Sequence, residues 1–194
     1  MGMSRTTNPE TVPAVMAAAS ELFYSRGVGA TVVDDIAKAS RLTKPTIYRH
    51  FPSKGALLAR YLDDRNRYLD RELRAWIDTA PPTDRPRVVI DWLCDWISRP
   101  GFNGCAFVRA RAELPQDDSI RRRAMERKRT VLVAIIEACR ASGAPDASGL
   151  ALQLALIVEG ATTMAFISGD ARPAVAAARA LGRVALQAAG LDED

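Results

Sequence analysis

The segment from Thr31 to Leu58 constrains the fold more than any other part of this chain. It predicts two short helices joined by a tight turn, and a third helix after the Phe51-Pro52 break. The second short helix has an apolar helix behind it and carries mostly hydrogen-bonding side chains. These are Thr43, Lys44, Thr46, Tyr48, Arg49 and His50. A short helix of this kind fits the major groove of DNA.

Positive charge is concentrated in the same part of the chain. Residues 1–60 contain eight lysines or arginines and four aspartates or glutamates, which accounts for the whole net charge of +4. The remaining residues carry 19 basic and 19 acidic side chains. Localised positive charge favours a phosphate-bearing partner more strongly than a high total charge does.

Composition predicts a folded, water-soluble protein. The chain has 194 residues, of which 48% are hydrophobic and 26% charged, so it can bury a sizeable core and is not composed like a disordered protein. The N-terminus has no apolar core of the kind found in a signal peptide. The most apolar stretch, 150–167, is interrupted by polar residues and is expected to be a buried or interface helix rather than a membrane span. We therefore expect a cytoplasmic protein with no membrane partner.

The three cysteines, Cys94, Cys105 and Cys139, are widely spaced and predict neither a disulfide framework nor a zinc site. A reducing compartment is the simplest context for them. The sequence contains no HExxH, GxSxG, GxGxxG or CxxC motif. We therefore expect no catalytic residues, no metal and no cofactor, and the protein is not predicted to be an enzyme.

The periodicity of apolar residues predicts an all-α protein of about nine helices. Thr31 is expected to cap the second helix with Asp34 as a capping-box partner, Thr43 to cap the third, and Ser53 to cap the long fourth. Pro45 is tolerated in a first helical turn, where its missing amide has no partner. The expected helices cover about 9–26, 31 to the turn at 41, 43–50, 53 to the break at 79–84, 85–98, 105–114, 117–143, 147–168 and 173–190.

Several motifs at fixed spacing lie between residues 17 and 58. They are Leu22, Phe23 and Gly27; Thr31, Asp35, Ile36 and Ala37; Thr46 to Phe51; and Ser53, Lys54, Leu57 and Leu58. In this arrangement the chain resembles the tetracycline-repressor (TetR) family. The resemblance implies a three-helix helix-turn-helix DNA-binding domain over 1–52 and a helical ligand-binding and dimerisation domain over 53–194. The segment 105–118 also looks like part of a regulatory domain of that family.

The resemblance also implies which residues contact double-stranded DNA. Thr31, Tyr48, His50 and Lys54 would grip the backbone; Lys44, Pro45, Thr46 and Arg49 would approach base edges, and Thr43 completes the set. Arg49 could bind a guanine edge or a phosphate. A catalytic or metal-binding role for His50 is disfavoured, because no acidic or cysteine partner lies near it in the sequence. Asp34 and Asp35 are interpreted as complements to a helix dipole.

Two positions depart from the pattern of the family. Arg41 stands in the turn where glycine is common, and a left-handed conformation there would cost roughly 1 kcal/mol or more. Pro45 replaces a small residue and removes one amide that could bind phosphate, while its ring could meet a thymine methyl group.

The C-terminal helices are expected to bind a ligand and to dimerise. The family resemblance implies a cavity between the fourth and seventh helices for a small apolar or aromatic effector. Its predicted lining is Trp76, Trp92, Trp96, Phe102, Phe107 and the polar Arg109. Plain core packing is the alternative for the aromatic residues. The small residues of the last two helices favour close pairing with a second copy across a two-fold axis.

A dense basic cluster, Arg121–Arg123 and Arg127–Arg129, is interpreted as a solvated helix face paired with nearby acids, with a second nucleic-acid site as the alternative. Taken together, the sequence predicts a homodimeric, ligand-responsive repressor that binds a palindromic operator. A constitutive DNA-binding regulator without an effector is the alternative.

Overall fold

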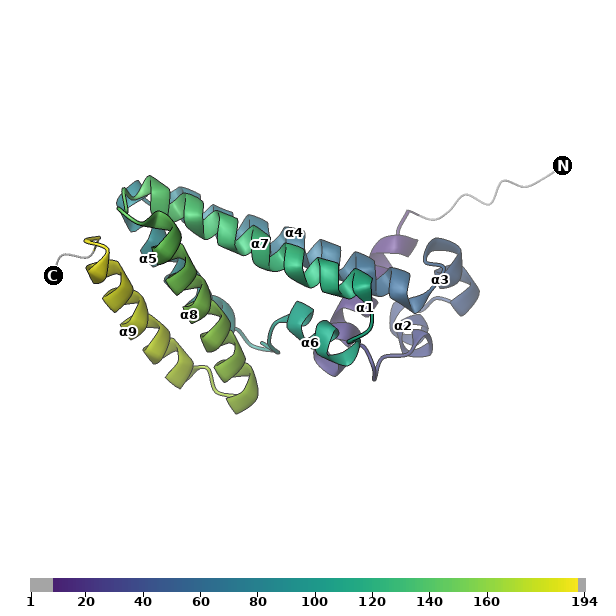
Figure 1. Cartoon of the computed structure of the whole chain (residues 1–194). Coiled ribbons are helices and arrows are strands. Elements are labelled where there is room, and N and C mark those ends of the chain that lie inside the picture. Colours follow the sequence, from purple (N-terminus) through teal and green to yellow (C-terminus); the bar gives the residue numbers. More distant parts are fainter. Residues whose placement is uncertain (1–8, 192–194) are drawn as a thin grey trace.

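Within residues 9–191, which the computed structural model describes, every regular element is helical (Figure 1). The all-α prediction of about nine helices is confirmed for this range. The elements are α1 Thr11–Arg26, α2 Val33–Ser40, α3 Lys44–His50, α4 Lys54–Thr79, the short 3-10 turn η1 Pro82–Asp84, α5 Arg85–Ser98, α6 Ala106–Glu113, α7 Asp118–Ala141, α8 Ala147–Ser168 and α9 Arg172–Ala188.

Two apolar cores follow one another along the molecule, and α4 belongs to both. Leu57, Leu58 and Leu62 pack with α1, α2, α3 and α6. Further along the same helix, Leu69 and Leu73 pack with α5, α7, α8 and α9. The first core extends past residue 52, so the first turns of α4 pack as part of the helix-turn-helix region. A division of the chain at 52/53 stays a prediction.

Two of the three predicted helix caps are confirmed. The backbone N–H of Thr46 donates to Thr43 Oγ1 at 3.4 Å, and the N–H of Ala56 donates to Ser53 Oγ at 3.1 Å. Each bond satisfies one of the amides that the first turn of a helix leaves unpaired. Pro45 lies in the first turn of α3, as expected.

The predicted capping role of Thr31 is wrong. The α2 helix begins at Val33, and Val32 precedes it without any side-chain cap. Thr31 is 0% exposed, and its hydroxyl donates to the carbonyl oxygens of Leu22 and Gly27 at 3.2 and 2.7 Å. The hydroxyl therefore connects the segment before α2 to the last turns of α1 and to the glycine that ends it.

The turn between α2 and α3 has the expected left-handed residue. Arg41 has φ = 57° and is the one non-glycine residue with positive φ among the described residues. The N–H of Leu42 donates to the carbonyl of Ala37 at 3.0 Å, which closes the end of α2. The geometry that places α3 across α2 therefore depends on a strained arginine.

One described helix, α8, is long and apolar enough to cross a membrane by length and composition alone, and 39% of its most apolar window is buried inside the protein. It packs against both α7 and α9. Midway along it, Glu159 accepts from Lys128 Nζ of α7 at 2.5 Å. These contacts make α8 a component of the helical bundle.

Candidate nucleic-acid interface and ligand cavity

The α3 helix lies at one end of the elongated molecule, and α8 and α9 lie at the other (Figure 1). Ile47 anchors α3, since its side chain is 0% exposed and belongs to the core of the helix-turn-helix region. Phe51, which follows the helix, is also buried. The remaining side chains of α3 are left to face outward.

The structure brings eight of the nine predicted DNA contacts together around α3 and the start of α4. Thr43, Lys44, Pro45, Tyr48 and Arg49 are exposed, and Thr46, His50 and Lys54 are half-buried. The ninth, Thr31, is removed from the surface because its hydroxyl is used inside the protein. We therefore exclude the side chain of Thr31 from the candidate interface.

The acidic residues of α2 already have basic partners within the chain. Lys44 Nζ lies 2.6 Å from Asp34 Oδ1, and Arg26 NH1 lies 3.7 Å from Asp35 Oδ2. Both aspartates also lie in the first turn of α2, where negative charge complements the helix dipole. The side chain of Arg49 has no such partner among the described residues. The surface thus presents a guanidinium that is free to bind a phosphate or a base edge.

The ring of His50 has a buried nitrogen, Nε2, that is shielded from solvent and has no hydrogen-bond partner among the described residues. Over residues 9–191 there is no group of three or more histidine, cysteine, aspartate or glutamate side chains that could hold a metal ion. Burial raises the pKa of the Cys94 thiol, and that of Cys139 to about 11, which disfavours reactive thiolates at both.

A small cavity of about 20 Å³ lies between helices α4 to α8. Three of the six predicted ligand residues, Trp92, Trp96 and Phe107, line it. The rings of Trp92 and Trp96 are stacked, with centroids 5.5 Å apart and an interplanar angle of 11°. The other lining residues are Leu69, Cys105, Ala106, Arg127, Lys128, Val131, Val158, Glu159 and Thr162.

Trp76, Phe102 and Arg109 do not line this cavity. Trp76 packs against the outside of the C-terminal core. Phe102 stands edge-on to Trp96 at 5.2 Å and borders a separate surface hollow. The guanidinium of Arg109 binds backbone carbonyl groups instead. Its NH1 donates to the carbonyl of Tyr24 at 2.6 Å and to that of Asn103 at 3.0 Å.

Sequence reasoning missed the most unusual residue of the cavity. Arg127 is 5% exposed, and burial lowers its pKa to about 10. The interpretation of the basic cluster as wholly solvated is therefore wrong at this position, although Arg121 and Arg123 do pair with Asp118 and Asp63. The signal was present in the sequence. Arg127 precedes Val131 by one helical turn and so falls on the inward stripe of α7.

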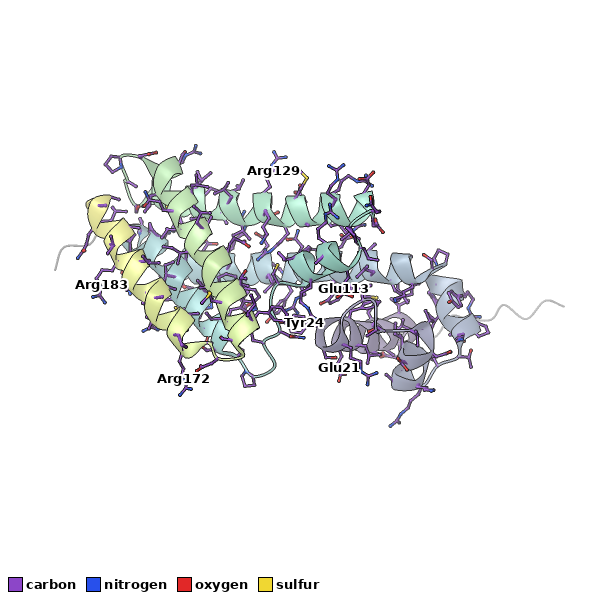
Figure 2. All side chains as sticks on the ribbon, turned by 60° about the horizontal axis from the view of Figure 1, so that its bottom comes forward. Glu21, Tyr24, Glu113, Arg129, Arg172 and Arg183 are labelled. Carbon is purple, nitrogen blue, oxygen red and sulfur yellow. The ribbon has the colours of Figure 1, made fainter. Side chains whose placement is uncertain are left out.

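Polar contacts connect α6 and the loop before it to the helix-turn-helix region. The N–H of Gly29, which follows α1, donates to Glu113 Oε2 of α6 at 2.5 Å. Asn103 Nδ2 donates to the carbonyl of Tyr24 at 2.7 Å, close to the bond made by Arg109. Figure 2 shows Tyr24 and Glu113 at the junction between α1 and α6. A displacement of α6 would therefore act on the end of α1.

The outer face of α8 and α9 is apolar. A groove of about 580 Å³ runs between the two helices. Its lining includes small residues, such as Gly160 and Ala177, beside Leu156, Met164 and Leu181. Leu156 and Ile167 are 64% and 75% exposed, which is unusual for large aliphatic side chains on one face of a soluble protein.

Residues 15–61, from within α1 to the first turns of α4, match the family described as "Bacterial regulatory proteins, tetR family". A TetR-family transcriptional regulator from Streptomyces coelicolor has the same fold over nearly its whole length. The two are 26% identical with a TM-score of 0.85, over 93% of this chain and 96% of that one. The chain belongs to the TetR family.

Other similar proteins agree with this assignment. A TetR transcriptional regulator from Chloroflexus aurantiacus is 26% identical with a TM-score of 0.79, over 92% of this chain and 94% of that one. The regulator EthR of Mycobacterium tuberculosis is 36% identical over 72 residues, or 37% of this chain. That match spans 33% of EthR. The similarity to EthR therefore concerns about a third of that protein. The alignments with the solved structures extend over the C-terminal helices of this TetR-family chain as well.

Proposed function

We propose that this TetR-family chain is a transcriptional regulator that binds double-stranded DNA through α2, α3 and the start of α4. The observation that carries the proposal is the outward row of Lys44, Tyr48 and Arg49 on a helix anchored by Ile47. A short helix with its donors outward suits the major groove. The capped start of α4, next to Lys54, offers free amides for a phosphate.

The functional unit in this proposal is a homodimer formed through α8 and α9. The exposed Leu156, Ile167 and Leu181 and the groove between these helices support it. Two copies related by a two-fold axis would present two α3 helices to successive major grooves, about 34–36 Å apart. Such a pair matches a palindromic operator, because the symmetry of the site mirrors that of the protein.

We further propose that a small molecule in the cavity lowers operator affinity, so that the protein acts as a ligand-responsive repressor. The cavity touches α6, and α6 is joined to the end of α1 by Glu113 and Arg109. The α4 helix runs from the candidate DNA surface to the same cavity. An effector acts through either route only to the extent that it binds the two arrangements with different affinity.

The test begins with selection of binding sequences from a random duplex pool by the purified protein. We expect a palindromic consensus, and binding to it that weakens steeply with salt as phosphate contacts release counterions. Enrichment of no sequence, or binding independent of salt, would reject the DNA-binding proposal. Retention of full operator affinity with every small molecule that binds the cavity would favour the constitutive alternative.

A further inference from the structure

Two residues that line the cavity among helices α4 to α8 each carry a buried donor without an acceptor in the described chain. Arg127 NH1 and Trp92 Nε1 are both shielded from solvent, and neither has a hydrogen-bond partner among the described residues. Both residues line the cavity. Buried polar groups in proteins are nearly always paired, so two orphaned donors at one cavity indicate a missing acceptor.

Among the described charged residues of the cavity wall, Arg127 alone makes no ion pair, and the nearby carboxylates of Asp70 and Glu159 act on it without a direct contact. Lys128 and Glu159 neutralise each other through contacts of 2.5 Å between Nζ and both carboxylate oxygens. Arg127, one residue before Lys128, makes no ion pair with any described residue. Its relative exposure is only 5%. A buried charge without a partner is costly, and a bound anion is one way to compensate it.

The rest of the wall is apolar and partly flat. The stacked rings of Trp92 and Trp96 form one side, and Leu69, Phe107 and Val158 contribute aliphatic and aromatic surface. Apolar walls with a few converging polar groups are typical of small-molecule sites. A guanidinium in such a site favours a carboxylate, because its planar donors can bind both oxygens.

We propose that this cavity binds a monocarboxylate with a flat apolar body, whose carboxylate accepts hydrogen bonds from Arg127 and Trp92. The single negative charge of such a ligand balances the single unpaired charge of the wall, and its body lies against the tryptophans. This inference rests on the proposed function in one respect: it names the chemical class of the effector.

The cavity must widen to admit such a molecule, because about 20 Å³ holds only about one water. Cys105, Ala106 and Phe107 form its α6 side. The short α6 helix is held to the end of α1 by the polar contacts of Arg109 and Glu113. Entry of a ligand past α6 would strain these contacts, which connects occupancy to the helix-turn-helix region.

Benzoate and its neutral isostere benzamide are the probes. Both have the same flat body, and the carbonyl of benzamide can still accept from Trp92, so their difference isolates the ion pair with Arg127. Titration calorimetry of the intact protein should show benzoate binding at least about tenfold more tightly than benzamide, since charge-assisted bonds are worth roughly twice neutral ones.

The matched variants are Arg127→Met and Arg129→Met. Arg129 lies on the same helix and points away from the molecule in Figure 2. We expect R127M to lower benzoate affinity at least about tenfold and to leave benzamide affinity within about twofold, while R129M changes neither. Because methionine removes a buried unpaired charge, the melting temperature of R127M should equal or exceed that of the wild type.

Three outcomes would overturn the inference: no saturable benzoate binding with a Kd below about 1 mM, equal affinity for benzamide, or full benzoate affinity in R127M. The first two require only the wild-type protein. Operator binding is measured separately. Benzoate binding that depends on Arg127 but leaves operator affinity unchanged would support the carboxylate site and reject the ligand response, whereas loss of the DNA-binding proposal leaves the calorimetry unaffected.

Discussion

The two ends of this molecule expose opposite kinds of surface. At the α3 end, the outward side chains apart from Pro45 carry hydroxyl, amine, phenol, imidazole or guanidinium groups, and the large apolar residue of the helix, Ile47, is fully buried. At the α8 and α9 end, large aliphatic side chains face outward. They are Leu152, Leu156, Met164, Ile167, Leu181 and Val184, each more than half exposed.

The two kinds of surface suit different kinds of partner. A polar surface is already solvated, so the α3 end can stay open until a partner replaces its water. Each large aliphatic side chain at the apolar end would contribute about 1.5–3 kcal/mol if it became fully buried, which favours a stable protein–protein interface there. The apolar end is therefore suited to assembly and the polar end to recognition. In our proposal recognition depends on assembly, because one α3 helix reaches only one half-site.

The largest expected effect comes from charging the apolar end. Leu156→Glu combined with Leu181→Glu should convert a dimer to a monomer, since each protomer would bury two carboxylates without partners in the interface. Operator affinity should fall by more than about 100-fold, because half of the groove contacts would be lost. Sedimentation equilibrium gives the oligomeric state, and fluorescence anisotropy with a labelled operator gives the affinity.

Met125→Glu is the matched control for this experiment. Met125 is 63% exposed, but it lies on α7, away from the groove between α8 and α9. This variant should remain a dimer with unchanged operator affinity. A double variant that also stays dimeric would show that the apolar face is not the interface, and the comparison between the two ends would lose its meaning.

At the polar end, Arg49→Ala should weaken operator binding by about 1–3 kcal/mol if the guanidinium binds a base edge, with relaxed preference at one operator position. A uniform loss across sequences would instead assign Arg49 to a phosphate. The melting temperature should not change, since Arg49 has no partner in the described chain. Arg67→Ala on α4 removes another exposed arginine, which pairs with Asp64, and should leave operator affinity unchanged.

Many of the helix boundaries follow from helix-breaking and helix-capping residues that can be recognised in the sequence. The predicted ranges 85–98 and 147–168 coincide with α5 and α8, because proline and glycine residues mark the flanking loops. The caps at Thr43 and Ser53 were also predictable, since a cap depends on residues within one helical turn. The exposed row on α3 follows from the burial of Ile47 and the helical period.

The errors occur where a distant segment decides the role of a residue. Thr31 has the sequence context of a cap, but the end of α1 provides acceptors for its hydroxyl. Trp76, Phe102 and Arg109 do not line the small cavity, and their predicted ligand contacts stay a prediction; the fold turns Arg109 toward the backbone of Tyr24. Arg127 was obscured by its charged neighbours, although its spacing from Val131 placed it inside.

Thr31→Val sharpens the comparison by separating stability from recognition at the polar end. The substitution removes the donor to the carbonyls of Leu22 and Gly27 at nearly constant volume, and should cost about 1–2 kcal/mol of unfolding free energy. Operator affinity measured below the melting transition should stay within about twofold, since the side chain is fully buried.

Thr43→Val, at the exposed cap of α3, is the contrasting variant. It should weaken DNA binding as well as lower the free energy of unfolding. Weaker operator binding by a fully folded Thr31→Val would return Thr31 to the contact surface.

The smallest expected effect concerns backbone strain, which also differs between the two regions. In the described C-terminal region every residue with positive φ is a glycine, whereas the turn of the helix-turn-helix uses Arg41 at φ = 57°. Arg41→Gly removes a left-handed penalty of about 1–2 kcal/mol but increases the entropy of the unfolded chain by about 0.5–1 kcal/mol. The net change should be a stabilisation of at most about 1.5 kcal/mol, measured by urea denaturation.

Gly143→Ala is the reciprocal control. Gly143 has φ = 81°, and nothing lies within 4 Å of an added Cβ, so any loss of stability reports the backbone alone. It should destabilise the protein by about 1 kcal/mol. If Arg41→Gly is destabilising while Gly143→Ala behaves as expected, the arginine side chain must contribute more to the turn than its backbone costs, and the strain at the recognition end would be offset locally.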